Sequence, residues 1–545
     1  MVASVGRESG GLWGHLASTV LTGYVRNTLL LAAGVSALTL LMGVSTAWLV
    51  TLCRFPGRAV LRWALLLPLA IPAYLGAYAY TDLLQYAGPV QDTLREVFGL
   101  GHGDYWFPEV RSLAGATVLL SLALYPYVYM AARAAFLEQS MAALEAARTL
   151  GLDPWRGFWR VALPLARPGV AAGLALVLME TLAEFGAVQY CGVDTFATGI
   201  VRTFRLPDEH ALTAAAQLSA LLLCFVAFLV AAEAWLRRSA RFFHTTTRRQ
   251  DLSAWSLHGA RAWSATAVCS LPVVLGFALP VVAFVRAQLL AADPRARETF
   301  LEMGRNSLVL ASGAAVLAVV LALLLTSARR FDGGLASRSA LAIAGFGYAV
   351  PGAVLAIGVL IVVTWLDQRW RELAGLVTGT PVGLLLSGSA FALIYGYQSR
   401  FLAVALNFLR SGFTRIEPSL DEAARTLGAT PLGTVARVQV PMLRGTLFAA
   451  MILVFVDVVK ELPATLILRP FGMETLSVRV YQLASDERLG EAASGALAII
   501  AVGLLPVIVL SWLVDRVGSS KRPRGEGALS LLDATDSGFA VAQND

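Results

Sequence analysis

The chain has 545 residues, of which 57% are hydrophobic and 14% are charged, and its mean hydropathy is +0.68. A soluble globular domain carries roughly 25% charged residues, so the composition excludes most soluble folds and predicts repeated membrane crossing. The net charge of +7 comes almost wholly from arginines in short clusters between apolar runs, which is typical of membrane topology signals and not of a nucleic-acid-binding face.

Eleven apolar stretches are long enough to cross a bilayer, which takes about 20 residues. In chain order they are 27–50, 61–82, 113–136, 168–190, 211–236, 264–289, 306–327, 340–366, 382–406, 443–466 and 491–514. The stretch before them, Leu12 to Tyr24, is short and contains His15. We expect either that it lies amphipathically on the outer surface or that an upstream helix is missing from the chain. The predicted fold is an all-α polytopic membrane protein with about 11–12 transmembrane helices.

Arginine clusters follow the first, fifth, seventh and last apolar stretches. They begin at Arg54, Arg237, Arg329 and Arg516. If the helices alternate in direction, all four clusters fall on one side of the membrane, and that side is the cytoplasm. The N-terminus is then expected outside.

The sequence contains an internal duplication. Glu145 to Gly151 recurs 277 residues later as Glu422 to Gly428, and upstream Arg26-Asn27-Thr28 resembles Arg305-Asn306-Ser307. A parallel duplication predicts two similar helix bundles about an axis along the membrane normal. The predicted segments are an external segment at 1–23, a first membrane domain at 24–237, a cytoplasmic linker at 238–263, an extra helix with an external loop at 264–302, a second membrane domain at 303–516 and a cytoplasmic tail at 517–545.

Both copies of the repeated motif fall in a loop that the charge pattern places in the cytoplasm. A short helix that ends at Gly151 or Gly428 suits an αL cap, which reverses the chain, and Pro154 or Pro431 then begins a turn and a second short helix. This pattern predicts a protruding knob whose small residues let a partner pack closely. An isolated motif of this kind would be only a capped loop helix, but two copies at the same topological place favour docking.

The motif resembles a known family signature. Glu145 to Gly151 with Pro164, and Glu422 to Gly428 with Pro441, resemble the EAA loop, or coupling helix, of the membrane subunits of binding-protein-dependent ABC importers. The stretches 179–187 and 460–472 further resemble the fused double permeases of the ferric-iron uptake group. The resemblance implies ATPase-coupling residues at Glu145, Ala146, Ala147 and Gly151, and at Glu422, Ala423, Ala424 and Gly428.

The resemblance also implies the partners and the location. Two copies of an ABC ATPase subunit would bind the coupling helices, and an external solute-binding protein would dock outside a multi-pass protein of the bacterial inner membrane. No Gly-x-x-x-x-Gly-Lys-Ser/Thr stretch occurs in the sequence. We therefore expect no enzyme activity and no cofactor in this chain, with ATP and Mg bound by the partner ATPase subunits.

Two pairs of acids lie within apolar stretches. Glu180 and Glu184 are four residues apart, as are Asp457 and Glu461, so each pair is expected on one helix face. An ionised group within the membrane costs at least about 2.5 kcal/mol, so the four acids are expected to face an interior path. Oxygen ligands suit a hard cation, and we expect transient encounters instead of a tight metal site. The alternative is structural: Lys460 neutralises one acid, and the others cap or pair near helix ends.

The function predicted from these features is the membrane-spanning permease of an ATP-driven importer for ferric iron delivered by an external binding protein. A related permease for thiamine or an organophosphonate is the nearest alternative. A secondary transporter driven by an ion gradient belongs to a different class, and it would leave both cytoplasmic motifs unexplained.

Overall fold

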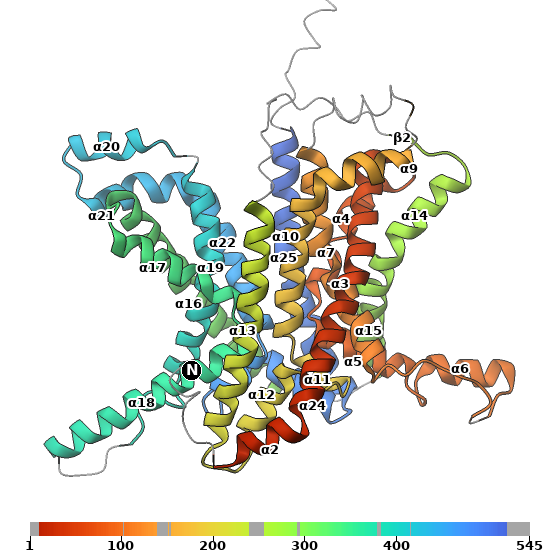
Figure 1. Cartoon of the computed structure of the whole chain (residues 1–545), viewed down its shortest axis with the longest axis horizontal. Coiled ribbons are helices and arrows are strands. Elements are labelled where there is room, and N and C mark those ends of the chain that lie inside the picture. The colour runs from red at the N-terminus through yellow and green to blue at the C-terminus, as the bar shows by residue number, and fades with distance from the viewer. Residues whose placement is uncertain are drawn as a thin grey trace, which may run out of the picture.

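The computed structural model describes residues 10–101, 103–138, 151, 154–238, 255–290, 295–378, 383–414 and 416–519. Helices make up nearly all of the regular structure in these ranges (Figure 1). The described strands are the two-residue strands β1 (Cys53–Arg54) and β2 (Trp255–Ser256), which pair in parallel. The predicted all-α membrane fold is confirmed.

The first half contains the helices from α2 to α13. Their bounds are α2 Leu12–Thr19, α3 Leu21–Leu52, α4 Arg58–Ala64, η1 Leu67–Ala70, α5 Ala73–Leu84, α6 Pro89–Phe98, α7 Leu113–Glu138, α9 Pro154–Gly157, η2 Phe158–Ala162, α10 Leu163–Ala183, α11 Gly186–Tyr190, α12 Phe196–Phe204 and α13 Ala211–Arg238. The segment 255–290 follows the linker. It forms β2, α14 Ala260–Val273, η3 Val274–Ala278 and α15 Leu279–Leu290.

The second half contains the helices from α16 to α25. Their bounds are α16 Arg295–Phe331, α17 Leu335–Phe346, η4 Gly347–Ala349, α18 Gly352–Thr378, α19 Ala390–Phe413, α20 Pro418–Thr426, α21 Pro431–Thr434, η5 Val435–Gln439, α22 Val440–Lys460, α23 Pro463–Leu468, α24 Leu476–Ser485 and α25 Leu489–Ser519.

Two predicted spans are broken helices. In the described ranges, 9 helices are long and apolar enough to cross a membrane, and Arg58–Ala70 with Ala73–Phe98 forms a further pair bent by 92°. The expected span 61–82 therefore breaks before Pro72, and 340–366 breaks at the equivalent Pro351. Proline lacks an N–H and disfavours helical backbone in the residue before it, so each break falls where the sequence places a proline.

Two further spans begin and end earlier than predicted. The expected spans 168–190 and 443–466 are continuous helical runs over Phe158–Ala183 and Pro431–Lys460. A π-helical turn, η2 or η5, precedes Pro164 or Pro441 in each run. Such a turn accommodates the hydrogen bond that proline cannot donate, so these prolines do not start the helix.

The duplication is visible in the packing. Helices α3, α7 and α10 pack together in the first half, as α16, α19 and α22 do in the second. The side-chain amide of Asn27 donates to the Asp194 carbonyl, and the Thr28 hydroxyl accepts from Phe196 N–H. Asn306 and Ser307 make the equivalent bonds to the loop before α24. The last helix of each half packs on the other half, α13 on α18 and α25 on η1, so the two halves form one body.

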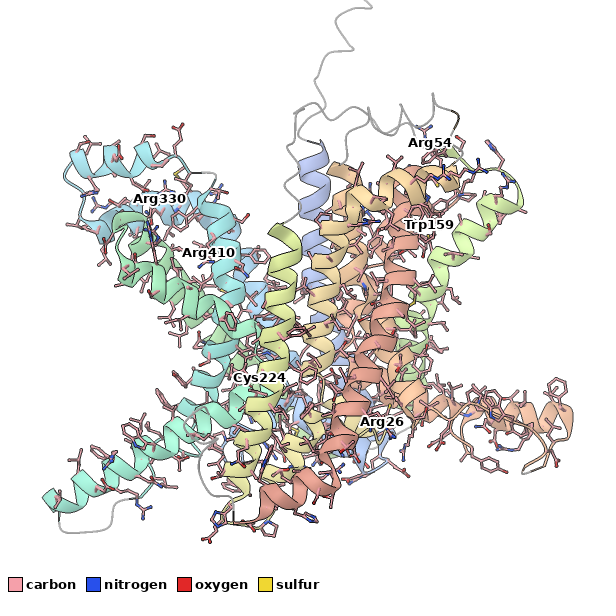
Figure 2. All side chains as sticks on the ribbon, viewed as in Figure 1. Arg26, Arg54, Trp159, Cys224, Arg330 and Arg410 are labelled. Atoms are coloured by element: carbon pink, nitrogen blue, oxygen red, sulfur yellow. The ribbon has the colours of Figure 1, made fainter. Side chains whose placement is uncertain are left out.

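Arginines that the sequence predicts to be cytoplasmic lie at one end of the molecule. Figure 2 shows Arg54, Arg330 and Arg410 at the end that carries α9 and α20 in Figure 1, whereas Arg26 lies at the opposite, outer end. Helix α2 lies at the end opposite to α9 and α20 and packs on α3 and α13, with Leu16 buried against the bundle (Figure 1).

Candidate functional site

The second copy of the repeated motif forms a helix, a reversal and a second helix. Pro418 begins α20, where its missing N–H has no intrahelical partner to lose. Gly428 has a φ of 85°, the left-handed conformation expected of it. The Thr430 hydroxyl then caps α21 by accepting from Gly433 N–H at 3.1 Å. The predicted arrangement is present, although the Glu417 side chain makes no capping hydrogen bond.

A buried polar anchor ties α20 to the membrane helices. The Asp421 carboxylate is buried and accepts hydrogen bonds from Arg330 of α16 and, at 3.1 Å, from the Gln439 side chain of η5. Arg330 also donates to the Ile416 carbonyl at 2.8 Å, and the Ser327 hydroxyl donates to Gln439 at 2.7 Å. These bonds connect α20 directly to α16 and to the helical run that ends at Lys460.

The opposite face of α20 is exposed to solvent. Glu422, Ala423 and Gly428 are exposed, Ala424 is half-buried, and Leu427 is 88% exposed. In Figure 1, α20 projects from the periphery of the cytoplasmic end. A leucine exposed to this degree beside small residues at a protruding turn is suited to contact with another protein.

The first copy of the motif lies mostly outside the described residues. Glu145, Ala146 and Ala147 belong to that part, whereas Gly151 is described and has a φ of 80°, as its counterpart Gly428 predicts. Elsewhere in the first half, described residues of α3, α7 and η2 form an aromatic cluster with the linker. The Trp48 ring lies 4.9 Å from Phe158, 5.7 Å from Phe136 and 5.3 Å from Trp255 of the linker, between ring centroids.

The acids Glu184 and Glu461 lie just beyond the ends of their helices. Each is the C-cap of its helix with extended backbone, so the prediction that each acid pair lies on one helix face is wrong for these two residues. Glu184 Oε1 accepts from Ala187 N–H at 2.8 Å, and Glu461 Oε1 accepts from Ala464 N–H at 3.0 Å. The carboxylate caps the short helix after the break, which satisfies an otherwise orphaned N–H and holds the acid in the membrane interior.

An arginine that the sequence analysis missed lies among the four acids. Arg400 Nη1 of α19 lies 3.2 Å from Glu461 Oε2, and both side chains are buried. The Arg400 guanidinium is also within electrostatic range of Glu180, Asp457 and Glu184. The signal was present in the sequence, because Arg400 interrupts the apolar stretch 382–406 and a charge at such a depth needs a partner.

The acids lie where the two halves meet. Lys460 Nζ donates to the Leu69 carbonyl of η1 at 2.9 Å and lies within electrostatic range of Asp457. Tyr127 of α7 is hydrogen-bonded to Tyr348 of η4, and both phenols are close to Glu180 and Asp457. We call Glu180, Glu184, Asp457, Glu461, Arg400 and Lys460 the interior charge cluster.

The four acids of the cluster are not compensated equally. Glu461 is paired with Arg400, and Asp457 has Lys460 beside it. No ion pair forms to Glu180 or Glu184 within the described ranges, and both are half-buried. The cluster therefore carries four carboxylates against two cationic side chains, and the uncompensated pair belongs to the first half.

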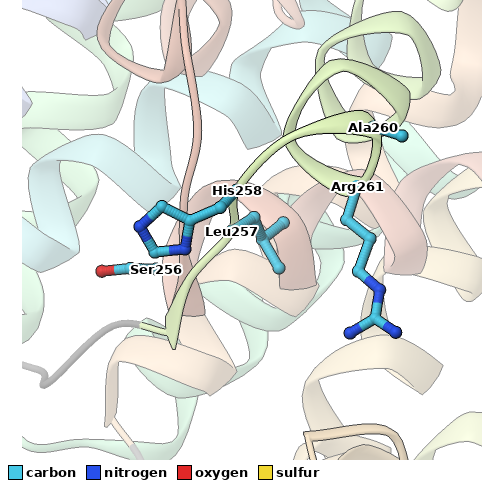
Figure 3. Close-up of a pocket in the computed structure, with 5 residues that line it drawn as sticks. All are labelled: Ser256, Leu257, His258, Ala260 and Arg261. Atoms are coloured by element: carbon cyan, nitrogen blue, oxygen red, sulfur yellow. The ribbon is translucent and has the colours of Figure 1, made fainter.

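The interior charge cluster is not a metal site of the usual kind. Within the described part of the chain, no group of three or more His, Cys, Asp or Glu side chains is placed to hold a metal ion. The pocket in Figure 3 lies elsewhere, on the segment that enters α14, and is lined by Ser256, Leu257, His258, Ala260 and Arg261. None of these residues belongs to the motif or to the cluster.

Comparison with known proteins identifies relatives along nearly the whole chain. The family model described as "Binding-protein-dependent transport system inner membrane component" matches residues 39–237 and again 314–523. The Fe(3+)-transport system permease protein FbpB 2 of Haemophilus influenzae is 25% identical over 498 residues, which cover 89% of this chain and 88% of that protein.

Two further relatives match about a third of the chain. The molybdenum transport system permease protein ModB of Escherichia coli is 33% identical over 172 residues, or 31% of this chain and 72% of ModB. The sulfate transport system permease protein CysT of the same species is 32% identical over 161 residues, or 30% of this chain and 55% of CysT. Relatives of this chain therefore include permeases named for Fe(3+), for molybdenum and for sulfate transport.

Proposed function

This chain belongs to the family of binding-protein-dependent transport system inner membrane components, and we propose that it forms the path by which ferric iron crosses the membrane. It is a multi-pass permease of an ABC importer, with both membrane-spanning halves in one polypeptide. An external binding protein delivers the iron, and the two halves open alternately to either side.

The interior charge cluster carries the assignment to a cation. It places four carboxyl groups and two cationic side chains where the halves meet, and within the described ranges Glu180 and Glu184 form no ion pair. Charges interact strongly at such a depth because little water screens them. The carboxyl and phenol oxygens of this path suit a hard cation such as Fe³⁺.

A second candidate is an oxyanion, because relatives of one half are named for molybdenum and sulfate transport. Arg400 is a suitable group for such an anion. However, its guanidinium is already paired with Glu461, and a divalent anion would have to pass four carboxylates. Thiamine, which is a cation, and an organophosphonate remain comparison solutes.

The coupling role rests on the exposed face of α20. Glu422, Ala423 and Gly428 face solvent on a helix whose other side is anchored through Asp421, so a partner that binds this face can pull on α16. We assign this face, and the matching face of the first copy, to two ATPase subunits that bind ATP and Mg and hydrolyse the ATP. A secondary transporter would need no such surface.

The test is uptake into lipid vesicles that contain the permease, its ATPase subunits and the external binding protein. ATP is enclosed in the vesicles together with the ATPase side of the complex, and the binding protein is added outside. Radiolabelled ferric iron should then accumulate in the vesicles, while molybdate, sulfate and thiamine should not. Iron uptake that persists without the ATPase, under an ion gradient alone, would contradict the importer assignment. Accumulation of an oxyanion in place of iron would contradict the assignment of the solute.

A further inference from the structure

Arg400 has no equivalent in the first half. The offset of the duplicated motif pairs Arg400 with Ala123 of α7, although Arg410 on the same helix is matched by Arg133. The arginine was therefore gained or lost in one half only. Glu184 and Glu461 both cap the helix that follows them. Among the described residues, Glu461 also forms an ion pair with Arg400, whereas Glu184 forms none.

The backbone of the second half makes room for this arginine. Gly352 begins α18 directly after Pro351, and a Cβ at this position would lie 2.2 Å from Arg400 Nη1 and 2.7 Å from Glu461 Oε1. The equivalent residue in the first half, after Pro72, is Ala73. Two positions thus differ together, a glycine and an arginine in one half against two alanines in the other.

The Arg400 guanidinium has fewer hydrogen-bond partners than a purely structural buried arginine needs. Arg400 is 7% exposed, yet its Nε has no hydrogen-bond partner among the residues that the structure describes. Arginine has five N–H donors, and an unsatisfied donor in a buried site is costly. A guanidinium that has one carboxylate partner and three more carboxylates within electrostatic range can exchange between them.

We propose that Arg400 is a tethered competitor for the transported cation: its guanidinium occupies the carboxylates between transport events, and the solute displaces it from Glu461 in order to pass. This inference rests on the proposed cation transport and adds a residue that sets affinity. The transported cation is not held tightly, because the Arg400 guanidinium returns to the carboxylates and displaces it. Because Arg400 is paired with Glu461 and the first half has no equivalent arginine, Glu180 and Glu184 receive the incoming ion first.

The test measures Tb³⁺ affinity of the full chain in lipid nanodiscs, by luminescence excited through nearby tyrosines such as Tyr127 and Tyr348. Arg400→Gln removes the competitor and should tighten Tb³⁺ binding at least about tenfold, because a unit charge at this depth acts strongly on a trivalent ion. Arg400→Lys keeps the charge and should stay near the wild-type affinity. Arg410→Gln is the matched control, since it removes an arginine from α19 away from the cluster.

Gly352→Ala is a second variant that keeps every charge. Its methyl group displaces the guanidinium from Glu461 and should also tighten Tb³⁺ binding, so it decides the matter if Arg400→Gln does not fold. Unchanged Tb³⁺ affinity in folded Arg400→Gln, or the same tightening in Arg400→Lys, overturns the proposal. If vesicles import iron while these affinities do not change, only this inference fails. If they import an oxyanion, the proposed function fails whatever the Tb³⁺ affinities are.

Discussion

The two halves share one architecture but balance charge differently in the membrane interior. Both place a glutamate at a helix break, where it caps the next short helix, so this structural role survived in both copies. The compensating cations Arg400 and Lys460 occur in the second half, at positions matched by Ala123 and Ala183 in the first. A duplicated acid can thus cap the next helix in both halves, while only one copy, Glu461, also forms an ion pair among the described residues.

The cytoplasmic ends differ in a similar way. The second half holds its coupling helix through the buried polar anchor of Asp421, Arg330 and Gln439, whereas Gln439 is matched by Ala162 in the first half. There, an aromatic cluster around Trp48 includes Trp255 from the linker. Among the described residues, the second half therefore has a polar anchor and the first half an aromatic cluster.

The largest expected effect comes from disrupting the exposed docking face. Ala423→Arg places a long charged side chain on the bare side of α20 and should reduce binding-protein-dependent uptake at least about 100-fold, because close approach of the ATPase subunit is blocked. Co-purification with the ATPase and vesicle uptake measure the effect. The thermal unfolding midpoint should not change, since Ala423 is exposed.

Ala146→Arg is the matched variant in the first half. Equal losses in both variants would show that both faces dock a subunit. Normal ATPase binding and normal uptake in both would contradict the coupling assignment.

The next effect separates the two capping acids. Glu184→Gln and Glu461→Gln should each abolish uptake while ATPase docking is retained, but only Glu461→Gln leaves a buried arginine unpaired. Breaking a buried ion pair costs about 3–5 kcal/mol, so Glu461→Gln should also lower stability in denaturant unfolding. Transport at the wild-type rate in both variants would contradict a cation path through the interior charge cluster. Equal stability of the two variants would contradict the conclusion that only Glu461 is paired with an arginine.

The smallest effect tests the glycine that accommodates Arg400. Gly352→Ala should destabilise the protein by about 1–3 kcal/mol, as insertion of a methyl group into a tightly packed site does, because the added Cβ collides with the guanidinium. The reciprocal Ala73→Gly in the first half should cost about 1 kcal/mol or less, since it removes only a methyl group from a helix end. Thermal unfolding of both variants checks this order. A costlier Ala73→Gly would contradict the asymmetry.

Much of the architecture was predictable from local patterns. Long apolar runs and the repeated motif predicted most of the spans and the two-half organisation, and the αL conformation of Gly151 and Gly428 was expected from the motif. Four of the errors in the span boundaries fell at prolines. Pro72 and Pro351 break spans that hydropathy treats as continuous, whereas Pro164 and Pro441 follow π-helical turns and do not interrupt their helices.

By itself the sequence determined which groups of the interior charge cluster enter the membrane, because each of them appears as an interruption in an apolar run. Which charges meet was decided only by the tertiary structure. Arg400 and Glu461 are separated by 61 residues, and Lys460 reaches Leu69 across 391 residues. Periodicity reports the face and depth of a residue along its own helix. The pairing of charges depends on how helices from both halves pack, and in this packing Glu461 meets Arg400 while Glu180 and Glu184 form no ion pair among the described residues.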